Sequence, residues 1–184
     1  MRVLLVCVAV ALLSSPVELR PRRRRPTVAD AFNDAEIPKI LNITAPKTML
    51  DVCYENAAIN LGNQVNAGDT IGELEINFPG EPGCLYTLIV LSTASASSRS
   101  LDLSTGCEVV DLLPASPIPG TGPHTYIFLL FQQPDEIDTL ADDIVALNTD
   151  RMAFNIADFV DNYCLQCPVA GNFFVTEFQD QDDD

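Results

Sequence analysis

Residues 120–133 read GTGPHTYIFLLFQQ, and this stretch decides the fold class. Its second part, TYIFLLF, is a nearly continuous apolar run, which is typical of a central strand covered on both faces. The glycines and the proline before it are turn formers. We therefore expect a strand that starts near His124 and lies inside a sheet, with Gly120 and Gly122 setting the turn that leads into it.

Other short apolar or alternating runs recur along the chain and are separated by Gly, Pro and Asn. They lie at residues 50–54, 71–78, 84–91, 107–113 and 172–178. Such closely spaced turn formers favour a mainly β fold with a few helices. The best helix follows Asn155, which can cap it, and carries Ile156, Phe159 and Tyr163 at helical spacing. A weaker helical or loop stretch covers residues 136–147.

The amino terminus has the pattern of a secretory signal. Residues 1–15 hold one arginine, an apolar run too short to span a bilayer, and two serines. Residues 16–31 follow as a basic linker or propeptide, in which Arg22 to Arg25 suit a protease that cuts after paired basic residues; a solvated linker is the alternative. We therefore expect a secreted, extracellular protein with no transmembrane segment.

The rest of the chain is strongly acidic. The whole sequence has a formal net charge of −16, and residues 1–25 hold six of its ten basic and one of its 26 acidic residues, which leaves four basic against 25 acidic, or −21. A body of this charge repels nucleic acid and anionic membranes. We expect a single domain at residues 32–178, followed by an acidic tail at residues 179–184.

Five cysteines lie outside the expected signal, which points to one or two disulfides and an unpaired thiol in an oxidising compartment. These disulfide candidates are Cys53, Cys84, Cys107, Cys164 and Cys167. For the CLQC segment that ends in Cys167 we favour a structural disulfide over a redox or metal site. Asn42, in the sequence Asn-Ile-Thr, is a glycosylation acceptor.

Several segments match family patterns in the same order. Residues 120–133 resemble GTGxHRYVFLLYxQ, and residues 151–174 (RMAFNIADFVDNYCLQCPVAGNFF) are similar to a pattern that ends in PVAGNFF. Residues 50–54 (LDVCY) and 85–91 (LYTLIVL) fit two further strands. By these motifs, residues 32–178 resemble the phosphatidylethanolamine-binding protein family, which includes Raf-kinase inhibitor.

The resemblance implies a central antiparallel sheet flanked by a smaller sheet and by helices, with a small pocket for phosphate-like anions. Several pocket motifs are missing. Residues 92–98 (STASASS) stand where the family has DPDAPSR, with Arg99 one place from the motif's arginine. Residues 100–106 are too few for the family's histidine-bearing strand, so we expect one strand to be absent. His124 survives, whereas Thr125 replaces the arginine that follows it.

The residues that this resemblance assigns to ligand binding are Ser92, Gly122, Pro123 and His124. A structural role for the histidine is the alternative. No catalytic motif occurs and no cofactor or metal site is expected. We therefore expect a non-enzymatic protein that binds a small lipid headgroup, a phosphate-like group or an apolar ligand. The alternative is a protein-interaction module, such as a secreted protease inhibitor or signalling antagonist.

Overall fold

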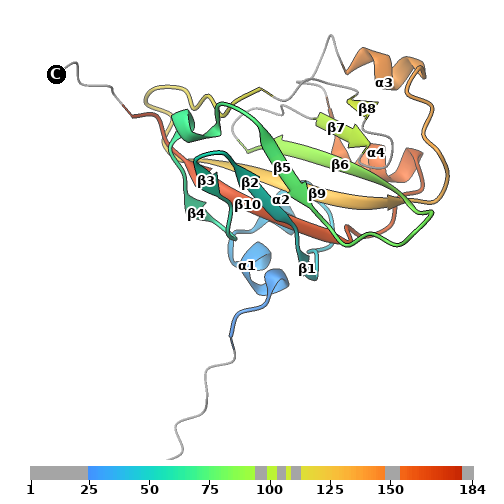
Figure 1. Cartoon of the computed structure of the whole chain (residues 1–184), viewed down its shortest axis with the longest axis horizontal. Helices are drawn as coiled ribbons and strands as arrows, with labels where there is room; N and C mark the ends of the chain where they lie inside the picture. Colours follow the sequence, from blue (N-terminus) through green and yellow to red (C-terminus); the bar gives the residue numbers. More distant parts are fainter. Residues whose placement is uncertain (1–24, 94–98, 103–106, 109–112, 148–153, 180–184) are drawn as a thin grey trace, which may run out of the picture.

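The computed structural model describes residues 25–93, 99–102, 107–108, 113–147 and 154–179, with the backbone alone for residues 99–102 and 107–108. Two sheets and a group of helices make up this part of the chain (Figure 1). The expected signal at residues 1–15, most of the basic segment and the end of the acidic tail lie outside the described residues.

The larger sheet has seven strands among the described residues. In spatial order they are β1 (Thr48–Met49), β10 (Ala170–Thr176), β9 (His124–Gln133), β6 (Leu85–Ser92), β7 (Arg99–Asp102) and β8 (Cys107–Glu108), and β4 (Asn63–Gln64) also pairs with β10. From β10 to β8 the pairing is antiparallel, whereas β1 and β4 run parallel to β10. The predicted central strands are confirmed as β6 and β9.

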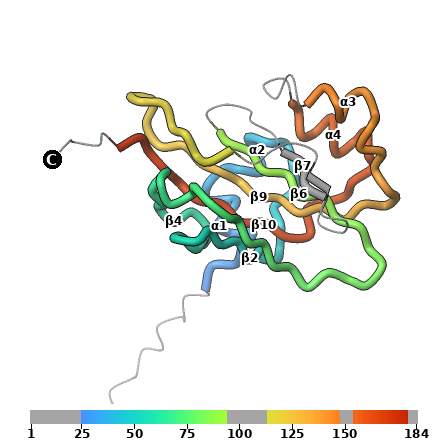
Figure 2. The backbone as a smooth tube through the Cα atoms, turned by 45° about the horizontal axis from the view of Figure 1, so that its top comes forward, coloured from blue at the N-terminus to red at the C-terminus, as the bar shows by residue number. Residues whose placement is uncertain are grey.

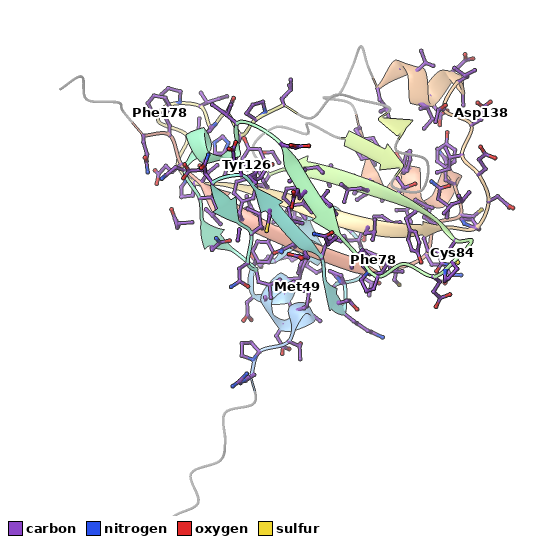
Figure 3. The ribbon with its side chains drawn as sticks, viewed as in Figure 1. Met49, Phe78, Cys84, Tyr126, Asp138 and Phe178 are labelled. Atoms are coloured by element: carbon purple, nitrogen blue, oxygen red, sulfur yellow. The ribbon has the colours of Figure 1, made fainter. Side chains whose placement is uncertain are left out.

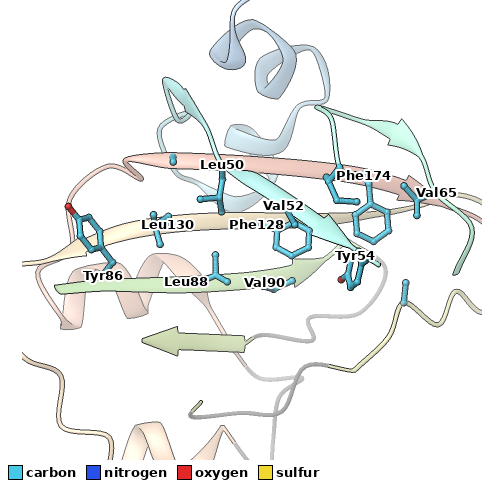
Figure 4. Close-up of a cluster of buried hydrophobic side chains, with 13 residues drawn as sticks. Leu50, Val52, Tyr54, Val65, Tyr86, Leu88, Val90, Phe128, Leu130 and Phe174 are labelled. Atoms are coloured by element: carbon cyan, nitrogen blue, oxygen red, sulfur yellow. The ribbon is translucent and has the colours of Figure 1, made fainter. Parts of the chain in front are cut away.

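The smaller sheet covers one face of the larger one. Its strands are β3 (Ala57–Ala58), β2 (Asp51–Tyr54) and β5 (Leu74–Asn77), and the 3-10 helix η1 (Ala67–Thr70) precedes β5. Leu74 and Ile76 are half-buried while Glu75 and Asn77 are exposed, as the alternation predicts. Figure 4 shows side chains of both sheets meeting in one apolar layer, with Val52 beside Phe128.

The opposite face of the larger sheet is covered by helices. They are α1 (Val28–Asp34), α2 (Ile37–Leu41), α3 (Asp142–Ala146) and α4 (Ile156–Asn162). Successive residues of β9 alternate between the two cores, so that Phe128 faces the smaller sheet and Ile127 and Leu129 face the helices. Figure 2 shows α3 and α4 together at one end of the molecule. No helix in the described ranges is long and apolar enough to cross a bilayer.

The helix after Asn155 is confirmed as α4, and the Asn155 side chain accepts a hydrogen bond from the Ala157 amide at 3.0 Å. By contrast, α1 begins at Val28, inside the stretch predicted to be a linker. Thr27 caps it through a capping box with Asp30, and the apolar side chain that it buries is Phe32. The folded part thus starts before the predicted boundary at residue 32.

Two short strands occupy the region in which we expect a lost strand. The backbone of β7 pairs with β6, and β8 pairs with β7, so β6 does not lie at the edge of the sheet. Among the described residues, the sheet therefore continues beyond β6. This pairing satisfies backbone groups of β6 that the loss of a neighbour would leave unpaired.

Asn172, from the PVAGNFF segment, joins β10 to the chain around the smaller sheet. Its side chain is fully buried and its amide nitrogen donates to the carbonyls of Leu50 at 2.8 Å and Ile59 at 2.9 Å. Its amide oxygen accepts from the backbone nitrogens of Leu61 at 2.8 Å and Phe173 at 2.9 Å. All four hydrogen-bonding positions of this side chain are used, so the asparagine of the PVAGNFF segment has a structural role.

Candidate functional site

His124 begins β9 and is the sole histidine of the chain. Its side chain is only 3% exposed. The preceding turn contains Gly120 at φ 74° and Gly122 at φ 75°, the left-handed region that glycine adopts without strain, as the sequence predicts. A β-carbon at either position would meet no atom within 4 Å, so backbone conformation rather than space favours glycine there.

The hydroxyl of Thr121 links this turn to the imidazole. It donates its single proton to the Ile118 carbonyl at 2.7 Å and lies 2.5 Å from Nε2 of His124. Because a hydroxyl has one proton to donate, Thr121 accepts from the ring, and Nε2 therefore carries a proton. The imidazole is held in one orientation by a neighbour three residues before it.

Two buried hydroxyls lie at the same end of the larger sheet. Thr176 of β10 pairs with His124, and Ser92 of β6 pairs with Tyr126, two residues along the same strand. These positions share the face that is turned toward the smaller sheet, because side chains two residues apart on a strand point the same way. Ser92, His124 and Thr176 therefore form a polar group, the sheet-end site, at one end of an apolar layer.

Neither hydroxyl of this site has a partner among the described residues. Oγ of Ser92 and Oγ1 of Thr176 are buried without a hydrogen bond, and these residues are 8% and 0% exposed. Buried polar groups are nearly always hydrogen-bonded, so two orphans at one place are unusual. A ligand with oxygen or nitrogen atoms could satisfy both.

The structure places the four residues predicted to bind ligand close to one another in the fold, but in different environments. Ser92 and His124 are buried at the sheet-end site, whereas Pro123 is exposed and Gly122 is half-buried in the turn beside them. Thr176 is a member that sequence reasoning missed. Its position opposite His124 depends on the β9–β10 register, which no motif of the sequence encodes.

A hollow of about 660 Å³ adjoins this end of the sheet. Ser116 lies at its wall and donates its backbone amide to the hydroxyl of Tyr126 at 3.0 Å. The ring of Tyr126 stacks on Phe174 with centroids 5.1 Å apart. Glu177 and Phe178, which follow Thr176 directly, also line the hollow. Figure 3 shows Tyr126 and Phe178 at this end of the molecule and Cys84 at the other.

Two other groups of predicted residues lie elsewhere. Cys53, Cys84, Cys164 and Cys167 are free thiols in the structure, and the side chains of Cys107 and Arg99 lie outside the described part, so the disulfides stay a prediction. Within the described ranges, no three His, Cys, Asp or Glu residues are arranged to hold a metal ion.

The glycosylation acceptor lies on the surface. Asn42 is exposed at the C-cap of α2, in the left-handed conformation at φ 53°, and Thr44 of the same acceptor sequence is also exposed. Asparagine adopts this conformation more readily than most residues. Occupancy by a glycan stays a prediction.

Comparisons with known proteins find similar curated relatives and similar solved structures, while no family model matches the sequence. The 26 kDa secreted antigen of Toxocara canis is 24% identical over 161 residues, which are 78% of this chain and 62% of that protein. The chain thus spans less than two thirds of the length of the relative.

Two solved structures are similar to this chain in fold. A carboxypeptidase Y inhibitor, solved with its cognate proteinase, superposes with a TM-score of 0.64 at 19% identity, over 83% of this chain and 95% of that one. The phosphatidylethanolamine-binding protein from Plasmodium vivax gives a TM-score of 0.59 at 13% identity, over 84% of this chain and 99% of that one. Agreement over more than four fifths of this chain and nearly all of each solved structure confirms the predicted fold.

Proposed function

Because this chain has the fold of phosphatidylethanolamine-binding proteins, we propose that it is a non-enzymatic binding protein whose sheet-end site takes a small phosphorylated headgroup. The similar structures are named as a binding protein and as an inhibitor, which supports a binding role over catalysis. The secreted relative and the apolar run at the amino terminus support export of this chain.

The orphan hydroxyls of Ser92 and Thr176 carry this proposal. A buried hydroxyl without a partner costs about 1–3 kcal/mol, so each such group calls for an explanation, and a bound ligand would supply the missing partner. Phosphate oxygens accept hydrogen bonds from hydroxyls and from an imidazole N–H, and these are the groups that the site supplies. The N–H of the His124 imidazole supplies a third donor beside the two hydroxyls.

Charge selects among phosphorylated ligands. The chain has a net charge of −16, and Glu177 directly follows Thr176. A free phosphate dianion is repelled by this surface, whereas a zwitterionic headgroup brings its own ammonium group to face the carboxylate. We therefore expect phosphorylethanolamine to bind more tightly than inorganic phosphate.

Nuclear magnetic resonance of the sole histidine tests the proposal. Phosphorylethanolamine should shift the His124 imidazole signals in a saturable way, and inorganic phosphate should do so only at higher concentration. The double variant Ser92→Ala, Thr176→Val should lose the saturable shift. Thr125→Val is the matched control, because Thr125 lies on the same strand but points to the other face. A wild-type chain that gives no saturable shift with either probe contradicts the proposal.

A protein-interaction role is the second candidate, and a specific surface favours it. Four large apolar side chains are exposed on segments that meet near the hollow beside Tyr126: Ile71, Leu113, Ile118 and Phe178. The amide of Ala115 donates to the Thr70 hydroxyl at 2.9 Å, which holds two of these segments together. Apolar residues grouped on a surface often mark a protein interface.

Inhibition of a peptidase tests this second role. If the chain acts like the inhibitor that it resembles in fold, it should slow peptide hydrolysis by carboxypeptidase Y at stoichiometric concentration. Ile118→Asp should weaken the inhibition, whereas Leu140→Asp, on an exposed residue outside this group, should leave it unchanged. Full hydrolysis at excess chain excludes this enzyme as a partner.

A further inference from the structure

A second hollow lies at the opposite end of the larger sheet and is bordered by three cysteines. Its volume is about 540 Å³, and Cys84, Cys164 and Cys167 line it together with residues at the end of β9. At this end Leu85 pairs with Gln133, whereas His124 lies at the other end of the same strand. We call this place the thiol hollow. It shares no residue with the sheet-end site.

Cys164 follows the end of α4 and has a backbone conformation that is unusual for a cysteine. Its amide donates to Asp161, and the next amide, of Leu165, donates to Val160 at 2.9 Å, which is the Schellman pattern that ends many helices. The residue at this place has a positive φ and is usually glycine, but here it is Cys164 at φ 52°. A β-carbon costs about 1 kcal/mol in this conformation, so stability alone does not favour a cysteine.

The sheet separates the chain at Cys84 from the chain at Cys167. Cys84 directly precedes β6, and Cys167 precedes β10, so β9 lies between them. Two strand spacings amount to roughly 9–10 Å, which exceeds the limit of about 7 Å between Cα atoms for a disulfide. The sulfur of Cys84 also has a hydrogen-bond partner, because the Gln132 side chain donates to it at 3.1 Å. Cys164 and Cys167 are both exposed and lie three residues apart.

The charge around the hollow selects the reactant. Asp135 and Glu136 line it, and both are exposed. The only described lysines and arginines with placed side chains are Arg25, Lys39 and Lys47, and none of them lines the hollow. Carboxylates at the entrance repel an anionic reactant and attract a cationic one.

We propose that the thiol hollow is a thiol–disulfide exchange site, in which Cys164 and Cys167 react with small cationic disulfides. One cysteine loses its proton to solvent and its thiolate attacks a sulfur of the small disulfide, which forms a mixed disulfide and releases a small thiolate. The second cysteine then loses its proton and attacks the protein sulfur of the mixed bond. A second small thiolate leaves, and both released thiolates take up protons. Two protein thiols are thus oxidised and one small disulfide is reduced to two thiols.

Reaction rates with two reactants test the charge selection. The probes are cystamine, a dication, and 2-hydroxyethyl disulfide, which is neutral. Asp135→Asn, Glu136→Gln should lower the ratio of the cystamine rate to the neutral rate by at least about threefold at low salt, and added salt should do the same to the wild-type chain. Glu73→Gln, Glu75→Gln, on exposed carboxylates near or in β5, is the matched control. A ratio that is unchanged in the hollow variant overturns the proposal.

Mass spectrometry tests the assigned pair in the full chain. After cystamine treatment, peptide mapping should find a bond between Cys164 and Cys167. Cys167→Ser should instead retain a cysteamine adduct on Cys164, and Cys164→Ser should retain one on Cys167. Cys53→Ser, in the smaller sheet, should still close the bond. A bond from Cys84 to either partner, or single variants that retain no adduct, overturns the assignment. Because these readouts do not involve His124, they are independent of ligand binding at the sheet-end site.

Discussion

Nε2 of His124 lies 2.5 Å from the hydroxyl of Thr121, which itself donates to the carbonyl of Ile118. The threonine therefore acts as an acceptor for the ring and fixes its tautomer. Thr121, an exposed residue of the turn, thus sets which nitrogen of the buried His124 ring carries the proton.

The neutral histidine should be the tautomer protonated at Nε2. Nitrogen-15 spectra of the sole histidine distinguish the two tautomers directly. Thr121→Val removes the acceptor and should shift the population toward a mixture of both, whereas Ser116→Ala, an exposed serine nearby, should not. A wild-type ring protonated mainly at Nδ1 contradicts this assignment.

Asn172→Ala should destabilise the fold strongly. The change leaves the carbonyls of Leu50 and Ile59 without the donors that they use, and we expect a loss of about 3 kcal/mol in the free energy of unfolding. Chemical denaturation of both chains measures it. Asn77→Ala, on an exposed position of β5, is the control and should change stability by less than about 0.5 kcal/mol. Equal losses in the two variants would show that the hydrogen bonds of the buried Asn172 amide do not stabilise the fold more than an exposed asparagine does.

Two glycines should respond differently to alanine. Gly122 has φ 75° and open space around it, so Gly122→Ala should cost about 1 kcal/mol through backbone strain alone. Gly68 also has open space but lies in η1 without a positive φ. Gly68→Ala should leave stability unchanged or raise it slightly. The midpoints of thermal unfolding compare the two, and a reversed order contradicts the assigned turn.

The phenol of Tyr163 should ionise well above the pH at which a free tyrosine side chain does. Burial, followed by a hydrogen bond to Asp143 of 2.7 Å and the charge of that carboxylate, raises the pKa of Tyr163 well above its usual value of about 10. The folded chain thus holds a proton that the unfolded chain loses. The stabilisation from this group is complete below pH 10 and is lost as pH rises through the folded pKa.

Phenolate absorbance measures the titration, and Tyr163→Phe identifies the late step. Asp143→Asn should lower the pKa of Tyr163 only in part, since burial is the larger cause. Asp158→Asn, an exposed position in the first turn of α4, serves as the control. A late step that persists in Tyr163→Phe means that another tyrosine is responsible.

Asn42 should carry a glycan when the chain is made in a eukaryotic secretory pathway. Both Asn42 and Thr44 are exposed, and the asparagine ends α2. Thr44→Ala should abolish the mass shift that an amidase specific for N-linked glycans removes, and it keeps the asparagine in its left-handed conformation. Export without any such mass shift contradicts the prediction.

Local pattern was sufficient to predict the strands β2, β5, β6, β9 and β10 and the best helix. The apolar runs of β6 and β9 are continuous because both faces of these strands are covered, and the pattern of α4 starts at a capping asparagine. The turn before His124 was likewise predictable, because the two glycines serve a local backbone conformation. The start of α1 was missed, since this helix follows an arginine-rich segment and fully buries a single side chain, Phe32, which is a weak apolar pattern.

The contents of both candidate sites depend on how distant strands pair. Thr176 pairs with His124 on the neighbouring strand, although the two residues are 52 positions apart in the chain. Cys84 directly precedes β6 and Cys167 precedes β10, and β9 lies between these two strands. Composition and periodicity report on neighbours along the chain, so they identify which segments become strands. They do not encode register, and it is register that brings two orphan hydroxyls beside one imidazole.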